Sequence, residues 1–115
     1  MLKISESSNP AGIALQLAGT LDATTSPVFE TRLMGLIASG HFHVVINMQD
    51  VDYISSTGLR VFLKAIRAVR NQQGEMVLYS LQEQVQNTFR LAGFLSFFTT
   101  AASREAAWDI IHSKS

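Results

Sequence analysis

The most informative part of the chain is residues 43–72, which read His-Val-Val-Ile-Asn-Met-Gln-Asp-Val-Asp-Tyr-Ile-Ser-Ser-Thr-Gly-Leu-Arg-Val-Phe-Leu-Lys-Ala-Ile-Arg-Ala-Val-Arg-Asn-Gln. The run His43–Met48 is apolar enough to form a central strand that is covered on both faces. The stretch Thr57–Gln72 predicts a helix, because its apolar side chains recur at helical spacing on one face. Those side chains are Leu59, Leu63, Ile66 and Val69. A strand followed by such a helix is the repeating unit of an α/β domain.

The same alternation continues on both sides of this unit. Two short predicted strands, Leu2–Ser7 and Ile13–Leu17, flank an Asn9-Pro10-Ala11-Gly12 turn and should pair in antiparallel fashion. Ser26-Pro27 is typical of a helix start, and Gly40 of a helix end. The other predicted elements are strands at Met76–Tyr79 and Phe97–Thr99 and helices at Glu83–Leu91 and Arg104–Ile111. The pattern predicts an α/β fold with a mixed, mostly parallel β-sheet and about four packed α-helices.

Length and composition exclude several classes of protein. The 115 residues fit a single domain, residues 1–115, that can bury a core of its own. Nine basic residues balance nine acidic ones, so the chain lacks the basic excess that a nucleic-acid binder requires. The absence of cysteine excludes disulfides, zinc ribbons and thiol chemistry. With only three histidines, we expect neither a metal site nor a cofactor.

The sequence also favours one cellular location. The N-terminus has no signal-peptide pattern, and the longest uncharged stretch, residues 33–49, is interrupted by two glycines, two histidines and an asparagine. We therefore expect a cytoplasmic protein without direct membrane insertion. The hydrophobic fraction of 47% is high for so small a domain, which is compatible with a weak dimer or a constant partner.

The densest polar cluster lies at residues 50–58, just before the predicted second helix. Ser55, Ser56 and Thr57 place three hydroxyl groups at a helix N-terminus, where free backbone N–H groups and the helix dipole favour an anion. The simpler interpretation is that Ser55 or Ser56 is the N-cap and that the other residues form a turn. Both interpretations remain open at this point.

No arrangement of residues predicts an enzyme. A serine hydrolase would need a histidine base, but His41 and His43 lie at the start of a predicted strand, opposite its loop to Ser56. His112 lies in the terminal helix, and neither a Gly-x-Ser-x-Gly elbow nor a phosphate-binding loop motif is present. We therefore expect no catalytic residues.

A second polar segment, Gly19-Thr20-Leu21-Asp22, also connects a strand to a helix. Loops beyond the carboxyl ends of parallel strands hold the functional sites of α/β domains. This loop and the serine cluster should therefore meet at one edge of the sheet. Taken alone, Asp22 is a turn or capping acid.

These segments together resemble the STAS domain, a family that includes C-terminal domains of sulphate transporters and bacterial anti-sigma factor antagonists. The resemblance is carried by Gly19-x-Leu21-Asp22, by residues 44–48 and by residues 51–59. It spans nearly the whole chain, including Leu91-Ala92-Gly93-Phe94 and Glu105-Ala106. The Ser-Ser-Thr-Gly-Leu core after an apolar strand is its most specific part. The resemblance implies a single-domain STAS-like fold.

The resemblance also implies a function in signal transduction and transcription regulation. In antagonists similar to this chain, a serine at the second-helix N-terminus is phosphorylated by a kinase that is also the anti-sigma factor, and Ser56 matches that serine. The implied partners are a serine protein kinase of the histidine-kinase-like ATPase type and a serine phosphatase. The unphosphorylated form binds the anti-sigma factor and frees a sigma factor. The residues that would form the phosphosite pocket and partner surface are Asp22, Asn47, Ser55, Thr57, Gly58 and Leu59.

Two residues depart from the family pattern. Ser55 stands where the family often has aspartate, and Asn47 stands where the preceding strand often carries one. A phosphate on Ser56 would therefore meet less local repulsion. Ser55 is an alternative acceptor.

The predicted second helix also carries a basic stripe. Residues 60–70 hold four basic side chains and no acidic one: Arg60, Lys64, Arg67 and Arg70. Residues 1–57 contain two basic and five acidic residues, whereas residues 58–115 contain seven basic and four acidic ones. The stripe is either a solvated helix face or a surface for an acidic partner, with Arg60, Lys64 and Arg67 as its candidate contacts.

Two other functions are compatible with the sequence. A STAS protein without phosphorylation could be an accessory subunit of a transporter, such as a lipid-transport ABC complex, or a scaffold in a sensory assembly. A module that binds a small molecule or nucleotide at the same helix N-terminus is the second alternative.

Overall fold

The computed structural model describes residues 1–114 and has one five-stranded sheet at its centre. The strands follow the chain in the order β1-β2-β3-β4-β5. Strand β1 is antiparallel to β2, and all other neighbouring pairs are parallel. The strands are β1 (Leu2–Asn9), β2 (Gly12–Leu21), β3 (His43–Ile54), β4 (Glu75–Tyr79) and β5 (Thr99–Ala101). The predicted mixed, mostly parallel sheet is confirmed.

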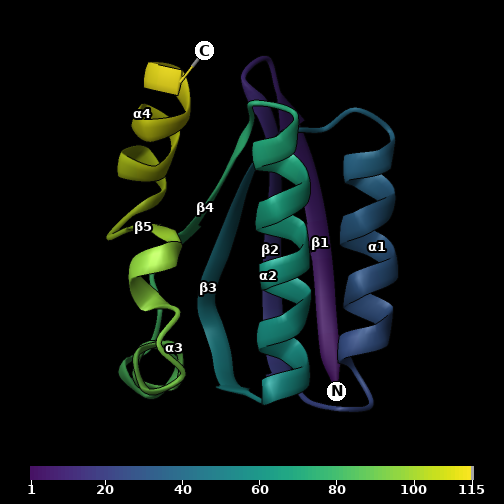
Figure 1. Ribbon diagram of the computed structural model, residues 1–115, viewed down its shortest axis with the longest axis vertical. Coiled ribbons are helices and arrows are strands. Elements are labelled where there is room, and N and C mark those ends of the chain that lie inside the picture. Colours follow the sequence, from purple (N-terminus) through teal and green to yellow (C-terminus); the bar gives the residue numbers. More distant parts are fainter. Residues whose placement is uncertain (115) are drawn as a thin grey trace.

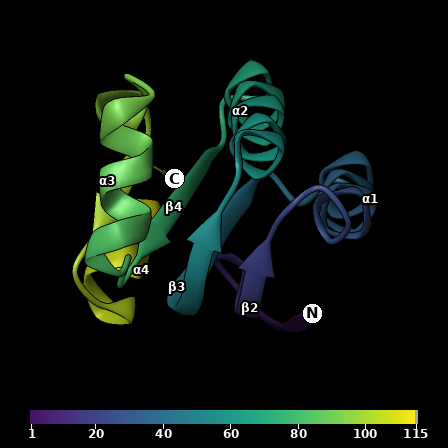
Figure 2. The same ribbon diagram turned by 90° about the horizontal axis from the view of Figure 1, so that it is seen from below.

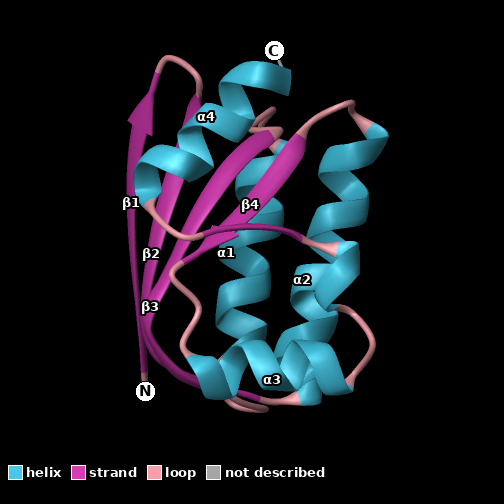
Figure 3. Ribbon diagram, turned by 90° about the vertical axis from the view of Figure 1, so that its left-hand side faces the viewer, coloured by secondary structure: helices cyan, strands magenta, loops and turns pink. Residues whose placement is uncertain are grey.

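Helices cover the two faces of the sheet unequally (Figure 1). The helices are α1 (Ser26–Ala38), α2 (Ser56–Asn71), α3 (Glu83–Leu91) and α4 (Arg104–Lys114). Helices α1 and α2 lie side by side on one face, and α4 crosses the other face (Figure 3). None of the helices within residues 1–114 is long and apolar enough to cross a membrane.

Strand β3 is longer than the sequence pattern predicts. The apolar run ends at Met48, but pairing with β2 continues to Ile54, which lies opposite Leu21. The register shifts twice along this pair, so the alternation of inward and outward side chains is interrupted. Val51 and Ile54 are nevertheless buried in the same core as Met48. Because β2 and β3 end together, the loops that follow them share one edge of the sheet.

The C-terminal strand also differs from the prediction. Leu95–Phe97 forms a single 3₁₀ turn, and β5 begins only at Thr99, so the strand predicted at Phe97–Thr99 exists but lies two residues further along the chain. The turn leaves Phe97 40% exposed and buries Phe98 against the rings of Phe62 and Phe89. Burial of the Phe98 ring thus takes precedence over the β propensity of residues 97–99.

The main core lies between the sheet and helices α1, α2 and α3. Its centre is an aromatic series in which the ring of Phe62 lies 5.2 Å from Phe29 and 5.9 Å from Phe89. Leu63, predicted to face inward, is only partly buried, because the buried arc of α2 is centred on Phe62 and Ile66. A second, smaller core lies under α4. It contains Val45, Val77, Tyr79, Ala107 and Ile111.

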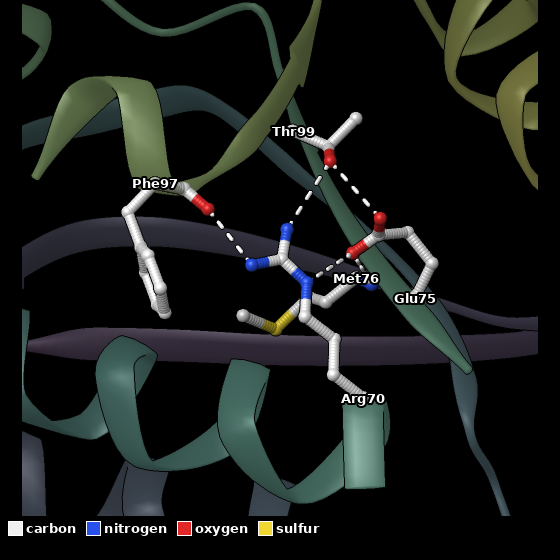
Figure 4. Close-up of polar contacts among 5 residues, drawn as sticks. All are labelled: Arg70, Glu75, Met76, Phe97 and Thr99. Carbon is white, nitrogen blue, oxygen red and sulfur yellow. Dashed lines mark hydrogen bonds and ion pairs between the residues drawn. The ribbon is translucent and has the colours of Figure 1, made fainter. Parts of the chain in front are cut away.

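Arg70 does not belong to the exposed basic stripe of α2 (Figure 4). Its guanidinium pairs with the buried carboxylate of Glu75 at 3.3 Å and donates a 2.9 Å hydrogen bond to the Phe97 carbonyl. A longer bond of 3.4 Å reaches the Thr99 hydroxyl, which itself donates to Glu75 at 3.1 Å. The guanidinium also lies 5.1 Å from the Phe97 ring centre. Arg70 therefore ties the end of α2 to β4 and to the segment before β5.

Replacing Arg70 should destabilise the fold much more than replacing its exposed neighbour Arg67. We expect Arg70→Ala to lower the free energy of unfolding by about 2 kcal/mol, because the buried Glu75 loses its ion-pair partner. Arg67→Ala serves as the matched control and should change it by less than about 0.5 kcal/mol. Urea denaturation of the two variants measures both values. Equal losses would contradict this role for Arg70.

Candidate functional site

The candidate site lies where β2 and β3 end and α1 and α2 begin, the edge viewed in Figure 2. The N–H group of Ser55 donates a 2.8 Å hydrogen bond to the carbonyl of Leu21. This bond joins the start of α2 to the end of β2. The two polar loops of the sequence are therefore neighbours, as predicted.

Ser55, Gly58 and Leu59 hold the start of α2 in place. Ser55 is the N-cap, and its Oγ accepts a 3.3 Å hydrogen bond from the N–H of Gly58. A Cβ atom on Gly58 would lie 2.9 Å from Ile54 Cγ1 and 3.1 Å from Leu21 Cβ, so only glycine fits there without displacement. Leu59 is 4% exposed and packs in the main core. Gly58 and Leu59 thus position the helix and offer little surface to a partner.

Ser56 is the first residue of α2 and is exposed to solvent. Within residues 1–114, its hydroxyl makes no hydrogen bond, and the N–H groups of Ser56 and Thr57 are likewise unengaged. Thr57 is half-buried, and the first turn of α2 contains no acidic residue. A free hydroxyl therefore stands where backbone N–H groups and the helix dipole favour negative charge.

Asp22 is engaged by its own loop. Its Oδ1 accepts hydrogen bonds from the Thr24 hydroxyl at 2.7 Å and from the N–H groups of Thr24 and Thr25 at 2.9 and 3.0 Å. These bonds, the one from the Thr24 side chain foremost, lower the pKa of Asp22 to about 2. Asp22 is thus a fixed negative charge in the loop whose Leu21 carbonyl binds the start of α2. Sequence reasoning missed the two threonines, although an aspartate with hydroxyl residues two and three positions later is typical of such a turn.

Asn47 lies away from this edge, contrary to the expectation that it joins the phosphosite pocket. It precedes Ile54 by seven residues on the extended β3, which corresponds to about 20 Å. It also lines a hollow on the α4 side of the sheet, and its Oδ1 accepts a 2.9 Å hydrogen bond from the N–H of Gln49. The expectation fails because β3 continues past Met48.

The same edge also has exposed apolar side chains, and glutamine side chains of the α3 start bind its backbone carbonyls. Tyr53, near the end of β3, is 53% exposed, and Val28, in the first turn of α1, is 64% exposed. The Nε2 atoms of Gln82 and Gln84, at the start of α3, donate to the carbonyls of Gln49 and Asp52 at 2.8 and 3.4 Å. Exposed aromatic and aliphatic side chains on a well-supported edge are typical of protein-binding surfaces.

Two of the three histidines lie at the opposite edge of the sheet from Ser56. His41 and His43 line a small hollow with the β1–β2 turn at the opposite edge of the sheet. Neither of these two imidazoles is therefore near enough to Ser56 to act as its general base.

The basic stripe continues from Ser56 along α2. Arg60, Lys64 and Arg67 border a shallow groove of about 560 Å³ between α1 and α2, which has Met34 and Leu63 among its apolar lining. Lys64 Nζ pairs with Glu30 of α1 at 2.9 Å. Arg60 and Arg67 form no ion pair with any described residue. Two unpaired cations thus lie on the helix that begins at Ser56.

Comparisons with known proteins agree on one family. A profile of the STAS domain matches residues 3–107. BtrV of Bordetella bronchiseptica, provisionally classed as an anti-sigma factor antagonist, is 41% identical over 79% of this chain and 78% of its own. The anti-sigma-B factor antagonist of Bacillus subtilis is 31% identical over 84% of this chain and 88% of its own.

The fold agrees with that of the Bacillus cell fate determinant SpoIIAA, an anti-sigma factor antagonist solved in two forms. Its unphosphorylated form superposes with a TM-score of 0.82 and 18% identity, covering 96% of this chain and 97% of SpoIIAA. The phosphorylated form gives a TM-score of 0.73 and 17% identity, with coverages of 95% and 99%. The profile matches most of the chain, and two curated relatives are more than 30% identical to it over more than three quarters of its length. The chain therefore belongs to the STAS domain family.

Proposed function

We propose that this protein is an anti-sigma factor antagonist whose partner binding is controlled by phosphorylation of Ser56. Its unphosphorylated form captures an anti-sigma factor that is also a serine kinase of the histidine-kinase-like ATPase type, and a sigma factor is freed. A serine phosphatase reverses the modification. The observation that carries the proposal is the exposed, unengaged Ser56 hydroxyl on the first residue of α2.

The two adjacent serines have different tasks in this proposal. Ser55 is committed to the helix, because its N–H and Oγ are both hydrogen-bonded. Ser55 is also only half-exposed, whereas Ser56 is exposed. A kinase therefore reaches Ser56 without disturbing the cap, which favours Ser56 over Ser55 as the acceptor.

Phosphorylation acts on binding and leaves the fold intact. A phosphate adds about −1.5 to −2 charges and three acceptor oxygens, which the free N–H groups of a helix start can accommodate. The same charge buried against a partner without a counterion costs several kcal/mol. Since about 1.4 kcal/mol corresponds to a tenfold change in affinity, that cost releases the partner.

The partner surface extends from the edge along α2. Tyr53 and Val28 provide apolar contact area beside Ser56, and the cations of Arg60, Lys64 and Arg67 favour an acidic patch on the partner. We propose that the protein works as a binding module in the cytoplasm and catalyses no reaction. The two curated antagonists favour this function over a transporter subunit or a sensory scaffold.

Stability measurements should separate the cap from the acceptor. We expect Ser55→Ala to lower the free energy of unfolding by about 1 kcal/mol, because Gly58 loses its capping oxygen. Ser56→Ala removes the same atom one residue later and should change stability by less than about 0.5 kcal/mol. Urea denaturation of both variants tests this. A larger loss at Ser56 would identify its hydroxyl as the cap.

Binding measurements should show the effect of charge at Ser56. Ser56→Asp should bind the cognate anti-sigma kinase at least about tenfold more weakly than Ser56→Ala, because it places an unpaired negative charge in the interface. Ser8→Asp adds the same charge to exposed β1 near the opposite edge and should bind as the wild type does. Isothermal titration calorimetry gives the three affinities. Equal affinity of the two Ser56 variants would refute the switch.

Salt dependence should reveal whether the basic stripe contacts the partner. Arg67→Glu should weaken the complex about three- to tenfold at low salt and reduce its dependence on salt concentration, because complementary charges steer association. Arg104→Glu, on the far face of the sheet, is the matched control and should leave binding unchanged. Surface plasmon resonance at several salt concentrations measures this. Identical behaviour of the two variants would assign the stripe to solvent.

A further inference from the structure

The face of the sheet opposite α1 and α2 is only partly covered. Helix α4 packs mainly on β3, β4 and β5 and covers less of the β1 and β2 side of this face. A hollow of about 380 Å³ lies there, lined by β1, β2 and β3 and by two side chains of α4, Arg104 and Trp108. This volume lies within the range of small-molecule sites. The Ser56 edge contributes none of its lining residues.

Tyr79 is the most informative residue of the hollow. It is 6% exposed and packs in the small core under α4, yet it also lines the hollow. Its hydroxyl makes no hydrogen bond with any described residue, and the oxygen stays accessible from the hollow. The fold thus places a tyrosine hydroxyl without a protein partner at this hollow.

The other polar groups of the hollow are mainly hydrogen-bond donors. The Arg104 guanidinium, the Trp108 indole N–H and the Asn47 amide nitrogen are free within residues 1–114, and all three residues line the hollow. The acceptor oxygen of Asn47 is already used by the N–H of Gln49.

The hollow also has an excess of positive charge. Its one acidic lining residue, Glu6, is paired with the Arg32 guanidinium of α1, with a 2.8 Å bond from Arg32 Nε. Arg104 has no acidic partner among the described residues. Surplus donors and an uncompensated cation call for a ligand with acceptor oxygens and negative charge.

We propose that this hollow binds a small organic oxyanion, such as a phosphate, sulfate or carboxylate, that carries a flat apolar body. Arg104 and the Tyr79 hydroxyl bind the oxyanion, and the flat body lies against the Trp108 indole. The site is separate from Ser56 and goes beyond the proposed function. Its test therefore succeeds or fails independently of the phosphorylation switch.

The single tryptophan makes the hollow directly observable. Trp108 is the only tryptophan of the chain, so its indole N–H gives one signal in a ¹H–¹⁵N NMR spectrum. The probe is phenyl phosphate, which joins an aromatic ring to an oxyanion. We expect it to shift this signal saturably, at least about tenfold more tightly than inorganic phosphate, which lacks the ring, or benzyl alcohol, which lacks the charge. An equal response to benzyl alcohol or to inorganic phosphate would overturn the proposal.

Conservative variants test the named contacts. Tyr79→Phe removes only the hydroxyl, and Arg104→Gln removes only the exposed charge, so the dispersion of each spectrum checks that the fold persists. Each should weaken phenyl phosphate binding about tenfold, and Arg67→Gln, which removes a cation from the other face, should not. No saturable shift at 10 mM, or equal binding by all variants, would overturn the proposal.

Discussion

The Ser55 N–H group donates a 2.8 Å hydrogen bond to the Leu21 carbonyl, and the candidate site depends on this bond. It joins two loops that lie more than thirty residues apart in the chain, because β2 and β3 are parallel neighbours that end together. A side chain on Gly58 would separate α2 from Leu21 and Ile54. Close packing at Gly58 and the Ser55–Leu21 backbone bond therefore fix the position of the Ser56 hydroxyl. The hydroxyl needs no hydrogen bond of its own to hold it there.

This arrangement separates stability from signalling. The cap, the glycine and Leu59 hold the helix start, whereas the Ser56 hydroxyl makes no hydrogen bond with any described residue. Asp22 adds a fixed negative charge, because the bonds within its own loop lower its pKa to about 2. That carboxylate therefore stays charged at neutral pH whether or not Ser56 is modified. A change at Ser56 can alter the local field without altering the scaffold beneath it.

The sequence predicted the order and type of the elements well, because strong apolar periodicity and turn residues mark them. It failed where tertiary structure overrides local pattern. The register shifts in the β2–β3 pair extend β3 through polar residues, and this extension moves Asn47 away from the site. Likewise, Arg70 has the helical spacing of the basic stripe, but a buried carboxylate on β4 attracts it. The pairing of β3 with β2 and the ion pair of Arg70 with Glu75 each join separate elements, so the local sequence pattern of one element cannot reveal them.

The open half of the sheet has a simple cause in the side chains of β1 and β2. Ser5, Ser7 and Ala14, which line the hollow, are small, so they offer α4 little apolar surface to pack on. Helix α4 instead covers Val45, Val77 and the ring of Tyr79. Larger apolar residues on β1 would have favoured closing this face and burying the Tyr79 hydroxyl without a partner, at a desolvation cost. Small residues beside the Tyr79 hydroxyl keep the hollow open and its hydrogen-bond donors accessible.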